Sequence, residues 1–246
     1  MDKKSFLEES AKYYDASKDY DSIMAHFDIR EMKRFFAGRT FLELGSSAGT
    51  ITKKLLFFCD SLDILEGSVL AINRTKKELN GESKVSYYDT LWEDFVPIRK
   101  YTDIVFVRGL EHIQNQSVFI KKISKWLLPG GRIHIIVPNA FSIHKILLSF
   151  FGKVNNIFKL SERDKKLGHK IIYDKTTLVF QVKKAQCMVL SVKTFFFKPF
   201  KNDVMKKISL NINNPFHKIL YVLGNLFPEY DAQIYLVCTP KHSAEI

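Results

Sequence analysis

With 246 residues, of which 46% are hydrophobic and 26% charged, the chain is long enough to fold around a sizeable core and does not belong to the disordered class. It shows no signal peptide and no apolar run near the roughly 18 residues of a membrane span, and its isolated cysteines (Cys59, Cys187 and Cys238) fit neither a disulfide framework nor a zinc site, so we expect reduced core thiols in a cytoplasmic protein. The net charge of +12 admits an anionic partner, but the lysines come as scattered pairs, and a solvated surface explains them more simply.

The first 138 residues predict two leading helices and then a regular alternation of strands and helices. Short apolar strands that alternate with helices are typical of a parallel sheet covered on both faces, with the carboxyl ends of its strands at one edge, where ligands bind. The Leu-Pro-Gly-Gly sequence at 128–131 is expected to end the last of these helices. The predicted helices are 5–15, 22–37, 49–58, 68–79 and 116–128, and the predicted strands are 40–44, 61–65, 84–88, 103–107 and 132–137.

After residue 138 the regular alternation of strands and helices stops, and longer helical insertions separate the last strands. No repeat, low-complexity tract or linker divides the chain, so one domain over 1–246 is expected, with a helical cover at 1–38, a core at 39–138 and insertions at 139–173 and 199–229. The elements predicted here are helical segments at 141–151 and 156–160, helices at 174–184, 203–210 and 215–226, and strands at 187–197 and 232–238.

Residues 41–50 form the most informative stretch, because a buried strand there runs into a turn of small residues and then a helix. Gly45 and Gly49 permit a tight turn and close approach of a ligand to the backbone, and the following helix N-terminus presents free N–H groups. Strand, turn and helix together are the opening unit of a nucleotide-binding sheet. The fingerprint is incomplete, since the middle glycine of G-x-G-x-x-G is replaced.

Acidic residues stand near the ends of the first three strands. Glu43 lies inside the first strand, Glu66 closes the second strand 21 residues after Gly45, and Asp89 closes the third. An acid about 20 residues beyond the turn can accept both ribose hydroxyls of a nucleoside, and Asp89 is placed to meet an adenine amino group. Strand-end acids also cap the helices that follow them, but three in register beside a glycine turn favour a nucleoside pocket.

In order and spacing, these motifs resemble the class I S-adenosylmethionine-dependent methyltransferases over about residues 40–138. The resemblance implies a Rossmann-like, doubly wound α/β sheet of seven strands, mostly parallel with an antiparallel last strand. One departure is Ser47, where most members of the family have glycine. The motifs are Glu43-Leu-Gly45-Ser-Ser-Ala-Gly49, Glu66, Asp89, the segment from Asp103 to His112 that contains Arg108-Gly109, and Leu128-Pro-Gly-Gly131.

The resemblance also implies the residues that bind S-adenosyl-L-methionine. Glu43 would orient its amino group, the turn would contact its methionine part, and Glu66 would hold its ribose. A dehydrogenase is disfavoured, because a dinucleotide needs the full glycine cradle for its pyrophosphate, whereas Glu43 suits a cationic amine. Tyr14 of the helical cover, whose tyrosines are expected mainly to pack, is a further candidate. The implied contacts are Glu43, Gly45, Ser46, Ser47, Gly49, Glu66, Gly67, Asp89, Thr90, Leu91, Arg108 and Gly109.

Methyl transfer to a hydroxyl needs alignment and a base, and histidine is the natural base near neutral pH. The candidates are His112 and His169, followed by Tyr173 and His144. His112 is as easily explained as a structural residue, and His144 as a surface residue. His134 alternates with apolar residues and is expected beside the core. No metal is predicted, although Glu111 with His112 is a partial ligand pair, as in some quinone-precursor relatives.

The insertions at 139–173 and 199–229 are expected to bind the acceptor, and the first of them resembles that of bacterial enzymes that methylate small metabolites, sugars or quinone precursors. The entrance formed by these insertions would have a positive electrostatic potential, which suits a phosphorylated or nucleotide-linked acceptor. The residues that would provide it are Lys145, Lys170, Lys198 and Lys201. The predicted function is therefore O-methylation of a small anionic metabolite in bacterial surface-glycan or secondary metabolism.

Three alternatives stay open. A nucleic-acid methyltransferase would also be basic, although Arg108-Gly-Leu-Glu stands where amino-directed base methylases carry an Asn/Asp-Pro-Pro-aromatic signature. A membrane-associated enzyme with a lipid-linked acceptor fits the apolar and basic segments 141–160 and 215–227. A non-catalytic nucleoside-binding module would keep the same pocket.

Overall fold

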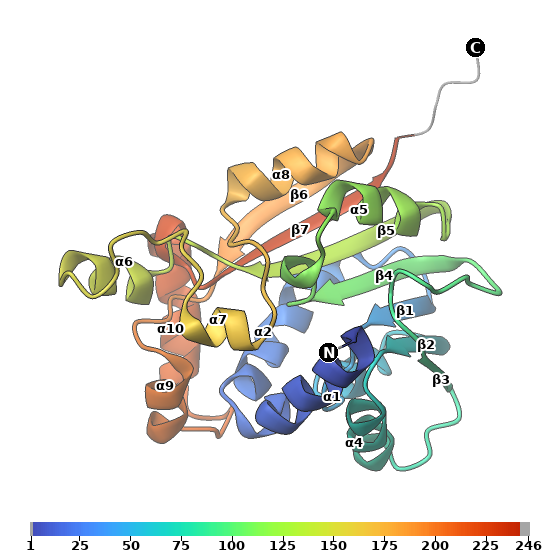
Figure 1. The fold of residues 1–246 in the computed structure, drawn as a ribbon, viewed down its shortest axis with the longest axis horizontal. Coiled ribbons are helices and arrows are strands. Elements are labelled where there is room, and N and C mark those ends of the chain that lie inside the picture. The colour runs from blue at the N-terminus through green and yellow to red at the C-terminus, as the bar shows by residue number, and fades with distance from the viewer. Residues whose placement is uncertain (1, 242–246) are drawn as a thin grey trace.

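A seven-stranded sheet runs through the molecule in the order β3-β2-β1-β4-β5-β7-β6, as the computed structural model of residues 2–241 shows (Figure 1). Strands β1 to β5 pair in parallel, while β7 is antiparallel to both β5 and β6. The predicted sheet with an antiparallel last strand is confirmed. Its strands are β1 Thr40–Leu44, β2 Ser61–Glu66, β3 Val85–Asp89, β4 Tyr101–Val107, β5 Leu127–Pro138, β6 Cys187–Phe195 and β7 Gln233–Pro240.

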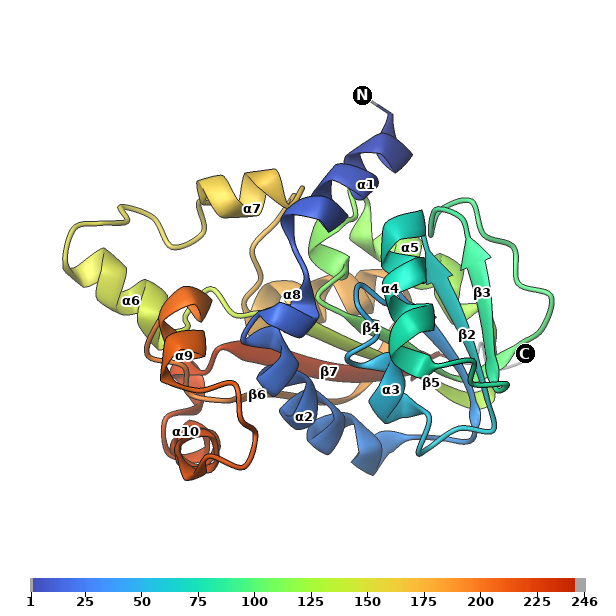
Figure 2. The ribbon, with the colours of Figure 1, turned by 90° about the horizontal axis from the view of Figure 1, so that it is seen from below.

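Helices cover both faces of this sheet, and each face has its own hydrophobic core. On one face α5 and α8 pack through Ile120 and Leu178, and on the other α2 and α10 pack through Met24 and Leu220 (Figure 2). With both faces buried, the carboxyl edge of the sheet is left for a ligand. The α-helices are α1 Lys3–Tyr13, α2 Asp21–Met32, α3 Thr52–Leu55, α4 Val69–Leu79, α5 Gln116–Ser124, α6 Ile143–Phe150, α7 Glu162–Lys166, α8 Lys175–Lys184, α9 Asn202–Ile208 and α10 Pro215–Leu226.

Three predicted helical segments were wrong in extent. The helix expected over 49–58 is the single turn α3, because the chain must turn back at once to enter β2. The helix expected over 116–128 ends at Ser124, since Leu127 already pairs with Tyr101 of β4. Segment 156–160 contains no helix, and α7 forms after it, where Ser161 and Asp164 make a capping box.

Other expectations about buried residues are confirmed. The three cysteines are buried and unpaired. His134 is fully buried and bonds Asp103 and Tyr235 at 2.9 Å each, so it belongs to the core. Within residues 2–241, no helix combines the length and the apolar character needed to cross a bilayer.

Candidate functional site

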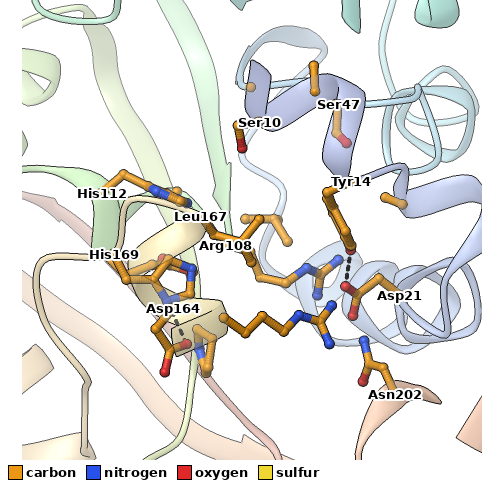
Figure 3. A pocket seen from close by; sticks show the side chains of 18 of the residues that line it. Ser10, Tyr14, Asp21, Ser47, Arg108, His112, Asp164, Leu167, His169 and Asn202 are labelled. Carbon is orange, nitrogen blue, oxygen red and sulfur yellow. Dashed lines mark hydrogen bonds and ion pairs between the residues drawn. The ribbon is translucent and has the colours of Figure 1, made fainter. Parts of the chain in front are cut away.

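A cavity of about 650 Å³ lies at the carboxyl edge of the sheet (Figure 3). Its walls come from the ends of β1, β2 and β4, from α1 and α2 of the N-terminal cover, and from the insertion that contains α6 and α7. The cover and the first insertion therefore enclose the place where the sequence predicted a nucleoside.

The glycine turn between β1 and α3 forms one wall of this cavity. Gly45 has a φ of +84°, and a Cβ there would lie 2.9 Å from the ring of Trp92, so only glycine fits. Ser47 has a φ of +53°, the left-handed conformation that glycine adopts most easily. Ser47 therefore keeps the turn shape of the glycine that it replaces.

Glu66, at the end of β2, holds this turn in place. Its carboxylate accepts the backbone N–H groups of Ser46 at 3.0 Å, Ser47 at 3.2 Å and Ser68 at 3.1 Å. Burial raises the pKa of Glu66, and the three N–H donors oppose that rise. Glu66, which the sequence analysis predicted to hold the ribose, therefore connects the glycine turn to the residue that caps α4.

Glu43 is buried in β1 at the floor of the cavity. Its Oε2 has no hydrogen-bond partner, and burial raises its pKa to about 8. A buried carboxyl group with an unpartnered oxygen is costly unless it meets a donor or a cation. The site is therefore suited to an amine, as the sequence predicted.

The end of β3 does not lie at the cavity, where the sequence analysis placed it. Asp89 is exposed and pairs with Lys4 of α1 at 2.9 Å, and neither Asp89 nor Thr90 lines the cavity. Leu91 and Trp92 do line it. The adenine contact of Asp89 and Thr90 stays a prediction, and Trp92 is a lining residue that the sequence analysis missed, although an aromatic residue soon after a strand-end acid was a signal.

At the end of β4, Arg108 and Gly109 line the cavity, while their contact with the methionine part of the cofactor stays a prediction. The guanidinium of Arg108 makes an ion pair of 2.9 Å with the buried Asp28 of α2 and donates to Gln233 at 3.1 Å. Burial raises the pKa of Asp28 to about 6, against the attraction of Arg108. The sequence analysis missed this pair, although an acid on the apolar face of α2 was a signal.

Tyr14 follows α1 and points into the cavity, where its hydroxyl donates to Asp21 of α2 (Figure 3). This hydrogen bond links the two helices of the N-terminal cover at the lining of the cavity. The predicted place of Tyr14 beside the cofactor site is therefore consistent with the structure.

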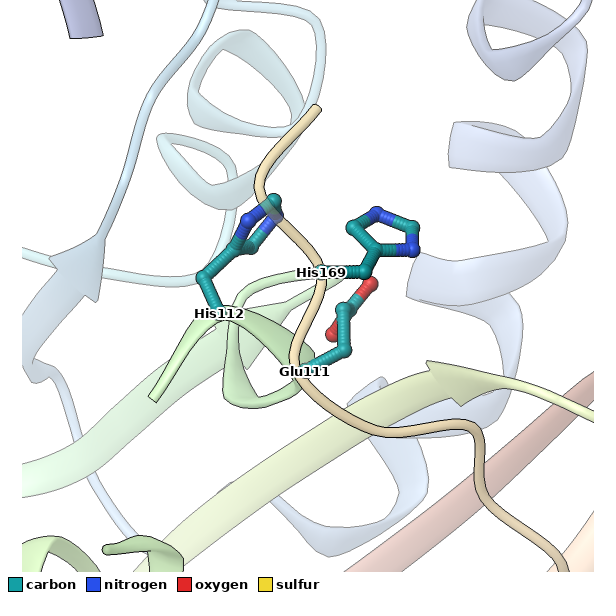
Figure 4. Close-up of side chains that lie close together, drawn as sticks. All are labelled: Glu111, His112 and His169. Carbon is teal, nitrogen blue, oxygen red and sulfur yellow. The ribbon is translucent and has the colours of Figure 1, made fainter. Parts of the chain in front are cut away.

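Three potential ligands of the predicted catalytic region come together at the end of β4 (Figure 4). One ligand atom each of Glu111, His112 and His169 lies within 4.8 Å of the other two, and Glu111 is buried with an unpartnered Oε2. Burial, and then the charge of His169, lowers the pKa of His112 to about 4, so this ring is neutral at pH 7. His169 is the third potential ligand, and the sequence analysis did not group it with Glu111 and His112.

His169 is oriented by a carboxylate from α7. Its Nδ1 lies 3.0 Å from Oδ1 of Asp164, and the capping box with Ser161 fixes Asp164 in turn. When Nδ1 carries the proton and donates to Asp164, Nε2 has a free lone pair. The sequence analysis missed Asp164, because the helix expected there was placed before it.

Solved structures resemble this chain over most of its length. DhpI in a complex with SAM and HEP matches with a TM-score of 0.63 and 16% identity, covering 96% of this chain and 95% of the other. The N-methyltransferase NodS from Bradyrhizobium japonicum WM9, in complex with S-adenosyl-L-homocysteine, matches with a TM-score of 0.56 and 14% identity (89% and 86% covered). An S-adenosylmethionine-dependent methyltransferase from Clostridium acetobutylicum matches with a TM-score of 0.57 and 11% identity (90% and 92% covered).

The chain has the fold of the class I S-adenosylmethionine-dependent methyltransferases. No protein-family profile and no curated protein sequence matches it. At these identities the likeness establishes the architecture, and the chemistry must be argued from the residues of the cavity.

Within this methyltransferase fold, the two remaining catalytic candidates lie in different places. Tyr173 is fully buried in the core and does not line the cavity, so we leave it out of the proposed site. His144 of α6 does line the cavity, and its Nδ1 is buried without a partner. Burial, followed by the charge of Lys198, lowers the pKa of His144 to about 3.

The far end of the cavity is basic. Lys145, Lys198 and Lys201 line it as predicted, joined by Lys159 and Arg163. Burial lowers the pKa values of Lys145 and Lys198. The predicted contribution of Lys170 is not observed, because this residue is exposed and does not line the cavity.

Proposed function

We propose that the chain is an S-adenosyl-L-methionine-dependent methyltransferase whose acceptor atom is a hydroxyl or phosphate-type oxygen of a small anionic metabolite. One observation carries this proposal: a single cavity joins the glycine turn and Glu66 at one end to Lys145, Lys198 and Lys201 at the other, with His169 among its lining residues. Its volume of about 650 Å³ is in the range of small-molecule sites.

The cofactor end fits S-adenosyl-L-methionine. Glu43 offers a buried, unpartnered oxygen to the amino group, Glu66 has carboxylate oxygens for the ribose hydroxyls, and Gly45 leaves the turn free of a Cβ. The cofactor supplies a methyl group already activated by a positively charged sulfur. What remains for the protein is to align the acceptor, exclude water and take up a proton.

His169 is the proposed base. Asp164 holds its Nδ1, which leaves Nε2 to accept the proton of an acceptor hydroxyl. Glu111 lies beside it with a raised pKa caused by burial, and His112 packs against its ring. The same three side chains are also a possible cation site, so activity should be measured with and without a chelator.

The basic end supports an anionic acceptor, such as a phosphorylated sugar or a sugar nucleotide of surface-glycan or secondary metabolism. Lysine and arginine side chains in a partly closed site bind phosphate or carboxylate oxygens through charge-assisted hydrogen bonds. The few acidic residues near them are engaged, since Asp164 bonds His169 and Asp19 bonds Arg163. A positive field is therefore left for the acceptor.

Replacing Lys145, Lys198 and Lys201 together with alanine is expected to raise KM for the acceptor by at least about 10- to 100-fold, because the loss of a single charge-assisted bond worth about 1.5–3 kcal/mol already gives that factor. The assay is methyl transfer from labelled cofactor to a panel of phosphorylated metabolites and sugar nucleotides and their neutral parents. Lys170→Ala is the matched control, since Lys170 belongs to the same insertion but lies outside the cavity. An unchanged KM in the triple variant would remove the anionic acceptor from the proposal.

Cofactor binding is expected to strengthen as the pH rises from 6 to 8. Since burial raises the pKa of Glu43 to about 8, its carboxyl group is mostly protonated at pH 6 and must ionise to pair with a cationic amine. Calorimetric titration with S-adenosylhomocysteine across this range checks the trend. Glu43→Gln should bind more weakly at pH 8 and lose the pH dependence; a variant with the wild-type slope would assign the trend to another group.

A further inference from the structure

Helix α6 is apolar but buries none of its side chains fully. Its sequence, Ile-His-Lys-Ile-Leu-Leu-Ser-Phe, contains five apolar residues out of eight, and no residue of the helix is buried. Phe150, at its end, is 82% exposed, and the adjacent Phe151 is 68% exposed. A helix of this composition normally packs against a core, so α6 lacks part of the apolar environment that its sequence suits.

A second exposed apolar stripe runs along α10. Ile219, Val222 and Leu226 are spaced three and four residues apart, which places them on one side of the helix, and all three are exposed. On the neighbouring α9, Val204 and Ile208 are exposed too. In both views α6, α9 and α10 gather at the same end of the molecule (Figures 1 and 2).

This end also carries most of the chain's net positive charge. Residues 141–170 contain seven Lys or Arg and two Asp or Glu, and residues 198–227 contain five and one. Together these two segments account for +9 of the formal net charge of +12. The net charge is therefore concentrated in the two segments that carry the exposed apolar side chains. Five of their twelve cations line the cavity, and the other seven, such as Lys153 and Lys206, are exposed outside it.

We propose that α6, α9 and α10 with their flanking segments form a docking face for an anionic phospholipid bilayer. The exposed apolar side chains would enter the interface, while lysines such as Lys153 and Lys206 would meet the lipid headgroups, each worth about 1 kcal/mol. A second copy of the chain is a poor occupant, because the same excess of positive charge would face itself. RNA is a poor occupant of α9 and α10, because the exposed apolar side chains of those two helices, such as Ile219 and Leu226, are aliphatic and do not stack on bases.

Docking in this way would bring the acceptor end of the cavity to the membrane surface. His144, Lys145 and Leu148 of α6 line the cavity, while Leu147 and Phe150 of the same helix are exposed. One short helix therefore contributes to both surfaces. The docking face itself does not depend on the proposed methyl transfer, and the two can fail separately.

Flotation of the full chain with vesicles tests the proposal. We expect it to float with phosphatidylcholine vesicles that contain phosphatidylglycerol, to stay at the bottom with pure phosphatidylcholine, and to be released by high salt. Phe150→Ser with Phe151→Ser should lower the bound fraction at least about tenfold, since burying each phenylalanine is worth roughly 1.5–3 kcal/mol. Phe57→Ser is the matched control, because Phe57 is 80% exposed but follows α3, apart from α6 in Figure 2.

The other occupants give different results. Failure of the wild type to float with anionic vesicles overturns the proposal. A dimer by light scattering that the double serine variant abolishes would assign the face to a second copy, and a salt-dependent RNA complex without flotation would assign the charge to nucleic acid. Calorimetry with S-adenosylhomocysteine on the double variant shows that it is folded, so that a loss of flotation can be attributed to the missing side chains.

Discussion

Replacing His169 with glutamine is expected to lower kcat by about 10²- to 10⁴-fold, the usual contribution of a general base. The affinity for S-adenosylhomocysteine should stay within about twofold, because His169 belongs to the insertion after β5, whereas Glu43 and Glu66 belong to β1 and β2. Steady-state kinetics with the best acceptor of the panel, together with calorimetry, measure both quantities. A near-normal kcat in this variant would show that methyl transfer here needs no base at this position.

Two companion variants separate a base from a structural residue. Asp164 is a positioning residue, so Asp164→Asn should reduce kcat less than the loss of His169 does and should leave KM for the acceptor nearly unchanged. If Asp164→Asn changes only the thermal stability and leaves kcat in place, the pair is structural. A chelator that abolishes wild-type activity would instead favour a cation at Glu111, His112 and His169.

Glu66→Ala is expected to weaken binding of S-adenosylhomocysteine by about 100-fold or more. Two hydrogen bonds from ribose hydroxyls to a carboxylate are worth about 3 kcal/mol together, and each 1.4 kcal/mol is a factor of ten. The variant also leaves the N–H groups of Ser46, Ser47 and Ser68 without their acceptor, which should lower the free energy of unfolding by about 1–3 kcal/mol. Calorimetry and urea unfolding measure the two effects.

The matched control for this experiment is Glu78→Ala. Glu78 is an exposed acid of α4 that pairs with Lys53 at 2.8 Å, and its loss should change neither binding nor stability by more than about 0.5 kcal/mol. Glu66→Gln adds a second test, since an amide oxygen can still accept from the turn but binds the ribose more weakly. Wild-type affinity in both Glu66 variants would mean that the ribose is held elsewhere.

The strands were predictable because burial leaves apolar residues in short runs. The apolar runs at 40–44 and 103–107 are the buried strands β1 and β4, and Glu66 was placed at the end of its strand from sequence spacing. Helix ends were less predictable: α3 and α5 are shorter than their apolar periodicity suggests, because pairing of the next strand takes residues that a helix would otherwise include.

The acceptor side shows the limit of such reasoning. Nothing in the sequence connects Asp164 to His169 and Glu111, because the contact depends on the path of the insertion after β5. The ion pair of Arg108 with Asp28 likewise joins β4 to the N-terminal cover, 80 residues earlier in the chain. Lysines 145 and 170 look equivalent in the sequence, yet only the first lines the cavity.

By itself, the sequence determined the α/β sheet, the glycine turn and the two acids Glu43 and Glu66 that line the cavity, since these follow from short-range periodicity and from the shared edge at which parallel strands end. Only the tertiary structure decided which insertion residues meet at the cavity and that the basic segments share one end with the apolar helices α6 and α10. The physical reason is that periodicity records which side of an element is buried, whereas the meeting of distant segments is set by how loops and helices pack around the finished sheet.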